Sequence, residues 1–366
     1  MTKYCYGCGV LLQANDEQKA GYVSKLDLRT DLLCQRCFRM KNYHEYHSHY
    51  LTSQHFKKIV AETIKNDCLI VLVVDLFDLN ASFNENIIEL IKQNPVIIVG
   101  SKRDLLLKSV KDQKIKAYLK MMAQKYDLNL QDVVLASAQK KYEIDTLLAS
   151  IYRFYQNKDV FIVGVTNVGK SSLLNALVNS VAQTKQQVTI SNYPGTTLDS
   201  IKIHLATNVY IYDTPGLVAE AQMIHYLEVV DYKYLQTKNE IKARNYQLEP
   251  QQSLFIGGLA CFNFLAGTAV GFNVFVNNNL KIHRTKYDNR AVLYDEHQAD
   301  DTLIPRVTSV KQYEDFIIHR FELKEDEIKK DLVIYGLGWI TFIASNQVIE
   351  LALPQGVKCK LREALI

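Results

Sequence analysis

Five continuous apolar runs lie in the middle of this sequence, at positions 68–74, 95–99, 133–136, 160–163 and 209–212. Uninterrupted runs of this length are typical of strands that are buried on both faces of a sheet. Polar and amphipathic stretches separate several of them, and those at 84–92 and 114–126 are predicted to be helical. Alternating strands and helices predict a parallel sheet with helices on both faces, so we expect an α/β domain here.

Residues after Gly216 follow a different pattern. Positions 226–250 are polar and rich in tyrosine, and short runs of alternating apolar and polar residues come next. The charged stretch 311–329 is predicted to be helical, and 332–340 has the composition of a strand. We therefore predict an α+β domain over residues 221–366.

One uncharged stretch, 253–277, is long enough to cross a bilayer as a helix. Glycines and asparagines interrupt it, however, and its apolar residues alternate with period two on either side of a break at Gly267 and Thr268. We therefore predict a β-hairpin in a small sheet and no membrane span. The alternating apolar residues are Phe262, Phe264, Phe272, Val274 and Val276.

Residues 1–52 hold four of the seven cysteines, arranged as two C-x-x-C pairs. Four thiolates at this spacing can close a tetrahedral structural zinc site, so we predict a small module held together by Zn²⁺. Free thiols in a reducing cytosol are the alternative, and His44, His47 and His49 are alternative ligands. The predicted zinc ligands are Cys5, Cys8, Cys34 and Cys37.

The composition is that of an ordinary globular protein, with 48% hydrophobic and 22% charged residues. A net charge of +4 permits an RNA partner without arguing for one. The N-terminus lacks the apolar core of a signal peptide, so we expect a cytoplasmic protein. Outside the two pairs, Cys68, Cys261 and Cys359 are expected to pack as small apolar residues. The patterns predict three domains, at 1–52, 53–220 and 221–366.

The segment 164–171, G-V-T-N-V-G-K-S, matches the phosphate-binding pattern G-x-x-x-x-G-K-[ST]. It lies between a predicted strand and a predicted helix at 172–179, which directs backbone N–H groups and a helix N-terminus at phosphate oxygens. We expect Lys170 to reach the β- and γ-phosphates and the Ser171 hydroxyl to bind Mg²⁺. The predicted nucleotide contacts in this loop are Gly164, Asn167, Val168, Gly169, Lys170, Ser171 and Ser172.

Two further motifs follow the phosphate loop. D-T-P-G ends a predicted buried strand, where Asp213 can hold Mg²⁺ and the Gly216 N–H can meet the γ-phosphate. P-G-T-T at 194–197 can act as a switch loop in which Thr196 or Thr197 closes over the Mg²⁺ and γ-phosphate, or it can be a plain turn. The predicted magnesium ligands are Ser171, Thr197 and Asp213.

The best candidate for reading the base, S-K-R-D, precedes the phosphate loop instead of following it. Asp104 can accept both N–H donors on the edge of guanine, which adenine lacks, and the stem of Lys102 can lie over the base. Ser101 stands where Asn is usual, and we expect its shorter hydroxyl not to span the same gap, which weakens nucleotide binding. After the next buried run, Ser137 and Ala138 can present a backbone N–H to the guanine oxygen.

Two positions bear on hydrolysis. Leu217 stands where many GTPases carry a water-orienting Gln, so a slow intrinsic rate is expected. Asn167 can help to hold K⁺ beside the phosphates, where the cation replaces an arginine finger, or it can simply shape the loop. The residues on which we expect catalysis to depend are Lys170, Asn167, Thr197 and Gly216.

The order of these motifs is permuted, because the base-reading residues come before the phosphate loop. In this order, and in several segments that are not general features of nucleotide-binding domains, the chain resembles the YqeH family of circularly permuted bacterial GTPases of ribosome assembly. The resemblance covers nearly the whole length. The segments that carry it are C-Y-G-C (5–8), C-Q-R-C (34–37), V-V-D-L-F-D-L-N-A-S (73–82), L-F-I-G-G-L-A-C-F (254–262), H-R-T-K (283–286) and G-L-G-W (336–339).

The resemblance implies a circularly permuted P-loop GTPase domain with an N-terminal treble-clef-like zinc finger and a C-terminal α+β domain that binds RNA or a partner. It implies a GTP/GDP switch in maturation of the small ribosomal subunit, bound to rRNA or pre-ribosomal particles, with K⁺ stimulation through Asn167. Cys261 and Asn263 replace residues that are often charged in the family, which is expected to alter a contact surface. An RNA-binding scaffold with a structural nucleotide is the alternative function; a metabolic P-loop kinase would need an acceptor site or lid that is not evident.

Overall fold

The structure of the protein, a computed structural model, describes residues 12–15, 22–23, 64, 67–183, 189–192, 201–205, 209–214, 216–297, 301–325 and 328–365. The chain forms two compact units. Two short segments of the predicted nucleotide domain, 74–84 and 102–121, belong to the same unit as the C-terminal residues 219–366. The first unit comprises Met1–Val73, Glu85–Ser101 and Met122–Val218. The three-domain division predicted from the sequence stays a prediction.

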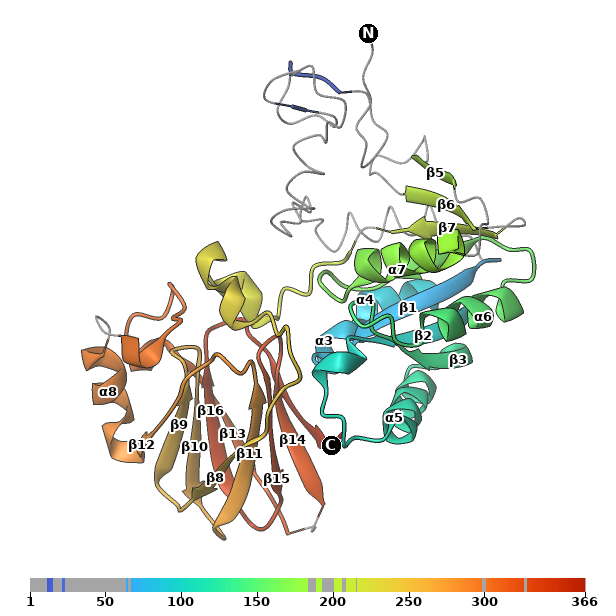
Figure 1. Cartoon of the computed structure of the whole chain (residues 1–366). Helices are drawn as coiled ribbons and strands as arrows, with labels where there is room; N and C mark the ends of the chain where they lie inside the picture. Colours follow the sequence, from blue (N-terminus) through green and yellow to red (C-terminus); the bar gives the residue numbers. More distant parts are fainter. Residues whose placement is uncertain are drawn as a thin grey trace. The chain divides into compact units, whose positions relative to one another are not determined.

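All five apolar runs form strands of one seven-stranded sheet, in the order β3-β2-β1-β4-β7-β6-β5 (Figure 1). Parallel pairing joins β2 to β3, β1 to β4 and β4 to β7, while β6 and β5 add an antiparallel edge. Strand β1 is buried along its whole length, as its uninterrupted apolar sequence predicts. The strands are β1 (Leu69–Asp75), β2 (Pro95–Ser101), β3 (Asn129–Leu135), β4 (Val160–Val163), β5 (Thr189–Asn192), β6 (Ile201–Leu205) and β7 (Val209–Asp213).

Helices connect these strands, and the two predicted at 84–92 and 114–126 are present with slightly shifted ends. Helix α6 shows why such segments fold this way: Ile144, Leu147 and Ile151 recur at helical spacing and are buried. The helices are α3 (Leu79–Ser82), η1 (Arg103–Leu105, a 3₁₀ turn), α4 (Glu85–Ile91), α5 (Asp112–Lys125), α6 (Ile144–Phe154) and α7 (Lys170–Gln183).

The C-terminal residues form two five-stranded sheets, in the orders β12-β9-β10-β16-β13 and β17-β14-β15-β11-β8. Every strand pair with a determined register is antiparallel. The strands are β8 (Arg244–Leu248), β9 (Gln252–Ile256), β10 (Ala260–Ala266), β11 (Val270–Val276), β12 (Ile282–Lys286), β13 (Ile317–Glu322), β14 (Lys329–Ile334), β15 (Gly338–Ile343), β16 (Val348–Leu353) and β17 (Cys359–Glu363). Helical segments are short: η2 (Met223–Tyr226), η3 (Val229–Tyr234), η4 (Tyr287–Asn289), α8 (Arg290–Glu296), η5 (Asp301–Leu303) and η6 (Tyr313–Asp315).

One apolar core is shared by both sheets. At its centre Phe272 of β11 packs against Phe262 and Phe264 of β10, with ring centroids 5.0 and 5.3 Å away, and against Phe342 of β15 at 5.3 Å. These four rings are essentially inaccessible to solvent. The alternating apolar residues found in the sequence therefore face this core, and aromatic pairs in tilted contact stabilise it beyond their buried area.

The predicted β-hairpin between residues 253 and 277 is wrong in its pairing, although its strands are present. Strands β10 and β11 belong to different sheets, and β10 instead pairs with β9. The chain changes sheets at Gly267, whose φ of +112° and close approach to the Asn346 carbonyl oxygen exclude a side chain. Alternation shows that a strand has one buried face, but a sandwich offers two sheets that satisfy it equally well.

The predicted helix at 311–329 is also wrong, because this stretch contains η6 and strand β13. Strand β13 lies at the edge of its sheet, where alternating exposed and half-buried residues carry the charges that suggested a solvated helix. The domain is accordingly richer in strand than the α+β expectation.

The expectation that Cys261 and Asn263 alter a contact surface is wrong, since both side chains are fully buried. The Asn263 amide oxygen accepts hydrogen bonds from Ser253 and Cys261, and its amide nitrogen donates to the Tyr313 hydroxyl 3.2 Å away. The two residues belong to a small polar cluster inside the domain. Cys68 and Cys261 are both buried, as the prediction that they pack as small apolar residues requires, and burial raises the pKa of both thiols to about 12.

Among the described residues, no helix is long and apolar enough to cross a membrane. The stretch 253–277, which had the length of a membrane span, is divided among three strands of a packed sandwich.

Candidate nucleotide site

The phosphate loop connects β4 to α7, as its sequence predicts. Asn167 and Gly169 both adopt positive φ, at +63° and +95°, which turns the loop back over the start of the helix. A side chain at Gly164 would meet the Val73 carbonyl oxygen of β1 at 2.5 Å. The glycine therefore allows the loop to start directly beside the neighbouring strand, and the loop leads into the N-terminus of α7, where backbone N–H groups can bind phosphate.

Lys170 is buried, with 8% of its surface exposed, and its Nζ donates to the Gly164 and Val165 carbonyl oxygens, each at 2.9 Å. Burial lowers the pKa of this ammonium group to about 8, and the nearby Asp213 opposes the shift. A side chain at Gly216 would come within 2.8 Å of the same Nζ. Lys170 and Gly216 thus lie together at the loop, where both were expected to meet the terminal phosphate.

Asp213 ends strand β7 beside the first turn of α7. The Ser171 hydroxyl donates to its Oδ2 at 3.4 Å, while its Oδ1 is buried and accepts no hydrogen bond in the described part of the chain. Burial raises the pKa of this carboxyl group, and Lys170 opposes the shift. Mg²⁺ prefers oxygen ligands, and the site offers a hydroxyl oxygen beside a buried carboxylate oxygen that accepts no hydrogen bond in the described part of the chain. Ser171 and Asp213 would therefore hold the ion. Bound Mg²⁺ would neutralise charge on the phosphates.

Leu217 contacts the phosphate loop through its backbone. Its carbonyl oxygen accepts the Thr166 N–H at 2.8 Å, and the side chain is fully buried. The Thr214 hydroxyl donates to the Ile162 carbonyl oxygen of β4 at 2.8 Å, which fixes the start of the same segment. Residue 217 therefore joins the two phosphate-facing segments, and its buried apolar side chain offers no group to orient water.

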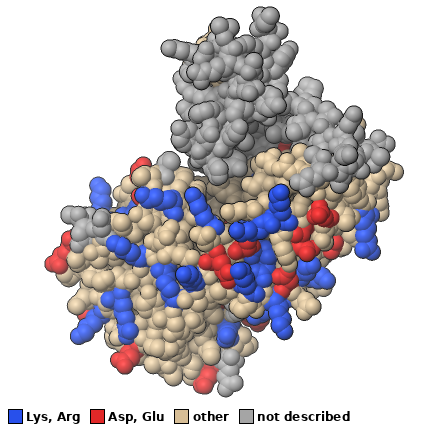
Figure 2. Space-filling model, viewed as in Figure 1, with Lys and Arg blue, Asp and Glu red and all other residues tan. Residues whose placement is uncertain are grey.

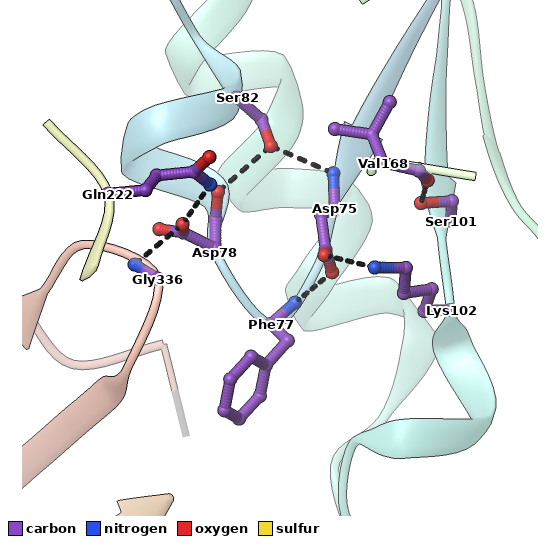
Figure 3. Close-up of polar contacts among 9 residues, drawn as sticks. All are labelled: Asp75, Phe77, Asp78, Ser82, Ser101, Lys102, Val168, Gln222 and Gly336. Atoms are coloured by element: carbon purple, nitrogen blue, oxygen red, sulfur yellow. Dashed lines mark hydrogen bonds and ion pairs between the residues drawn. The ribbon is translucent and has the colours of Figure 1, made fainter. Parts of the chain in front are cut away.

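Ser101 reaches the phosphate loop, contrary to the expectation that its hydroxyl is too short. Its Oγ donates to the Val168 carbonyl oxygen at 2.6 Å (Figure 3). The side chain is 5% exposed, so little water competes for this bond. The end of β2 and the phosphate loop lie close enough for the smaller residue to bridge them, which the sequence alone did not reveal.

Ser137 and Ala138 follow β3, and the N–H of Ala136 donates to the Gly100 carbonyl oxygen of β2 at 2.8 Å. The Ser137 N–H is already donated to the Tyr142 carbonyl oxygen at 3.2 Å, so Ala138 is the better candidate donor to a guanine oxygen. Ser101 and Asp213 end their strands, and Ser137 and the phosphate loop follow theirs, so all lie at the carboxyl edge of the sheet. Ligands bind at this edge in open α/β sheets.

Asp104 lies in η1 and Lys102 directly precedes this turn, and both belong to the second compact unit. Lys102 has a left-handed backbone with φ of +58°, and its Nζ lies 2.6 Å from Oδ2 of Asp75. Sequence reasoning missed Asp75, although an Asp at the end of a buried strand was the signal that identified Asp213. Asp75 is only 8% exposed and is the last residue of β1.

A second carboxylate, Asp78 in the loop that follows β1, was also missed. Its Oδ2 accepts hydrogen bonds from the Gln222 side chain at 2.7 Å and the Gly336 N–H at 2.8 Å (Figure 3). Burial raises its pKa to about 6. Nearby, Phe77 packs on Trp339 with ring centroids 5.6 Å apart. The G-L-G-W segment noted in the sequence therefore anchors the loop after β1.

Several predicted site residues lie outside the described part of the chain. They are Thr196, Thr197 and the four cysteines Cys5, Cys8, Cys34 and Cys37. Among the described residues, no group of three or more His, Cys, Asp or Glu side chains could hold a metal ion. The zinc site and the switch threonines therefore stay predictions.

The fold and the phosphate loop together define a P-loop GTPase whose motifs follow in permuted order. A family model described as "50S ribosome-binding GTPase" matches residues 159–250, and one described as "YqeH-like, C-terminal" matches residues 269–365. YqeH of Bacillus subtilis (strain 168) is 37% identical over 363 residues, which cover 99% of each chain. The chain belongs to the YqeH family of circularly permuted GTPases.

More distant relatives cover most of the chain. The NO-associated protein 1 of Arabidopsis thaliana is 26% identical over 92% of this chain and 69% of its own length. A solved structure of YjeQ from Thermotoga maritima shows a partial likeness that covers 43% of this chain and 50% of that one, at 20% identity and a TM-score of 0.26.

Proposed function

We propose that this GTPase acts as a switch in assembly or maturation of the small ribosomal subunit, bound to rRNA or a pre-ribosomal particle. The observation that supports a switch is the hydrogen bond from the Thr166 N–H to the Leu217 carbonyl oxygen, 2.8 Å long. It links the phosphate loop to the segment after D-T-P-G. Loss of the γ-phosphate would remove a contact of the Gly216 N–H, and the chain continues from Gly216 into the C-terminal domain. Thr196 or Thr197 would close over the Mg²⁺.

Nucleotide recognition in this proposal uses both ends of the permuted domain. Asp104 reads the guanine edge, the stem of Lys102 covers the base, and Ala138 donates to the guanine oxygen. Ser101 supports this site through its bond to Val168. The four N-terminal cysteines would bind Zn²⁺ and hold together a module that helps to contact RNA, since C-x-x-C pairs of this kind build structural sites.

The basic surface of the C-terminal domain supports an RNA partner. Figure 2 shows Lys and Arg side chains spread over the viewed face of this domain, with few acidic side chains among them. Exposed Lys and Arg residues bind phosphates without regard to sequence, and half-buried Tyr287 and His283 beside them suit base stacking. Exposed basic residues of this domain include Lys233, Lys238, Lys242, Lys281, Arg284 and Lys286.

A pull-down with purified ribosomal subunits tests this function. We expect binding to the small subunit that is stronger with a non-hydrolysable GTP analogue than with GDP and that weakens as salt rises. The large subunit is the matched comparison, because one family model carries the description "50S ribosome-binding GTPase". Equal binding with both nucleotides would refute the switch, and binding to the large subunit alone would refute the small-subunit assignment.

Potassium dependence is a separate prediction. Asn167 is exposed at the turn of the phosphate loop, where its backbone has a positive φ of +63°. Its amide oxygen can help to hold K⁺ beside the phosphates, so we expect turnover to fall about tenfold when Na⁺ replaces K⁺. Turnover of an Asn167→Ala variant should be equally slow in both salts. If the variant keeps the wild-type preference for K⁺, Asn167 only shapes the loop.

A scaffold function is the second candidate, favoured by the buried Leu217 side chain, which leaves no glutamine to orient water. In that case the nucleotide mainly stabilises the fold. A Lys170→Ala variant that still binds ribosomal subunits like the wild type, together with turnover that subunits do not change, would favour the scaffold over the switch.

A further inference from the structure

We propose that Asp75 is a positioning residue for guanine nucleotides, acting by holding Lys102 in place for the base. This inference rests on the proposed role of residues 101–104 in reading guanine. Asp75 is separated from Lys102 by 27 positions in the chain, and neither the motif order nor the resemblance assigns it a role.

The contact between the two residues is short and partly shielded from water. The Lys102 Nζ lies 2.6 Å from Asp75 Oδ2, and the Lys102 and Asp75 side chains are 33% and 12% exposed. Lys102 itself has a φ of +58°, a conformation that residues with a β-carbon rarely adopt outside special sites. The backbone turns the lysine side chain, and the carboxylate fixes its far end. A charge-assisted hydrogen bond in such surroundings is stronger than one on an open surface.

Asp75 ends β1 and is held in place by the segment that follows the strand, so it can serve as a fixed support. Its Oδ1 accepts the Phe77 N–H at 2.9 Å, which leaves Oδ2 for Lys102 (Figure 3). Its backbone N–H donates to the Ser82 hydroxyl at 3.0 Å, and that hydroxyl donates to the Asp78 carbonyl oxygen at 2.9 Å. Both carboxylate oxygens of Asp75 and its backbone N–H therefore have a defined hydrogen-bond partner.

The loop is anchored at its other end to the strands of the C-terminal domain. Asp78 accepts hydrogen bonds from Gln222 and Gly336, and Phe77 packs on Trp339. These contacts involve no nucleotide-binding residue, so the position of Asp75 is set before any ligand arrives. Holding a flexible lysine in its bound conformation raises affinity, because less side-chain entropy is lost on binding.

An Asp75→Asn variant tests the proposal. The amide keeps an oxygen for the Phe77 N–H, but it removes the negative charge and places an N–H₂ group against the ammonium. We expect the affinities for GDP and GTP to fall by the same factor, about tenfold, because the base is common to both. The kcat at saturating GTP should stay within about twofold of the wild type, since the phosphate loop is unchanged.

The matched control is Asp112→Asn. Asp112 pairs with the next residue of the same motif, Arg103, at the same distance of 2.6 Å, and Arg103 also donates to the Val110 carbonyl oxygen. The substitution removes the same charge from the same segment, yet it leaves Lys102 and Asp75 untouched. Nucleotide affinity should remain at the wild-type value. A loss equal to that of Asp75→Asn would overturn the proposal, since any disturbance of the segment would then suffice.

A double-mutant cycle with Lys102→Met decides whether Asp75 acts through the lysine. Methionine keeps a long apolar stem without the charge. We expect Asp75→Asn to cause no further loss of affinity in the Lys102→Met background. A full tenfold loss there, or none in the wild-type background, would overturn the inference while leaving the GTPase assignment intact. A wild-type protein that bound GDP no better than ADP would refute guanine recognition at 101–104 and this inference with it.

Discussion

A Lys170→Ala variant is expected to lose at least about 100-fold in GTP turnover, because no other cation of the phosphate loop can meet the β- and γ-phosphates. In the structure the ammonium group is buried against two loop carbonyl oxygens, so a phosphate needs only to displace these weak acceptors. Single-turnover kinetics at saturating GTP and Mg²⁺ measure the chemical step. The matched control is Lys158→Ala, because Lys158 precedes β4 and so lies at the opposite edge of the sheet.

The buried position of Lys170 also predicts that GTP turnover depends on pH. Burial lowers its pKa to about 8, so the free protein loses the charge as pH rises through that value, well below the usual lysine range. We therefore expect kcat/KM for GTP to fall above about pH 8, whereas kcat falls only at higher pH, because bound phosphates favour the charged form. A flat kcat/KM profile between pH 7 and 9.5 would contradict this role, as would a Lys170→Ala variant with wild-type turnover.

An Asp213→Asn variant is expected to lose about 100-fold in turnover and to need much more Mg²⁺ for half-maximal rate. The amide fits the same space beside Ser171, but it removes the charge from the oxygen that has no hydrogen-bond donor. Affinity for GDP without Mg²⁺ should change little, since the phosphate loop is intact. Titrating Mg²⁺ at fixed GTP separates loss of the ion from loss of the nucleotide.

The control for that variant is Asp132→Asn in β3. Its carboxylate accepts a hydrogen bond from Ser150 and from the backbone N–H of Val133, and it has no part in the site. Its Mg²⁺ dependence should equal that of the wild type. If Asp213→Asn also kept the wild-type Mg²⁺ dependence, the magnesium site would have to be placed elsewhere.

Local sequence was sufficient for the elements that carry the phosphates. The five apolar runs became strands because burial on both faces demands continuous apolar residues, whatever each strand's neighbour is. The phosphate loop could likewise be identified from its spacing, since Gly164, Gly169 and Lys170 act within a few residues of one another. The permuted motif order then identified the family, which the 37% identity to YqeH of Bacillus subtilis confirms.

Pairing between distant segments was the part that the sequence could not provide. Strands β10 and β11 were recognised, yet they separated into two sheets, because period-two alternation is the same in either. The edge strand β13 was mistaken for a helix, because charged residues face solvent on an edge strand as well as on a surface helix. Asn263 was expected to alter a contact surface, whereas it is fully buried and donates a hydrogen bond to Tyr313, which is distant in the sequence.

The sequence by itself thus determined the class of nucleotide-hydrolysing protein, the buried strands and the phosphate-loop motif, because these depend on residues adjacent in the chain. Only the tertiary structure decided that Ser101 reaches Val168, that Asp75 holds Lys102, and that the loop after β1 is anchored at Gly336. Each of these contacts joins residues tens or hundreds of positions apart. Such contacts form where strand ends and turns converge in space, a consequence of sheet order and packing that no local pattern records.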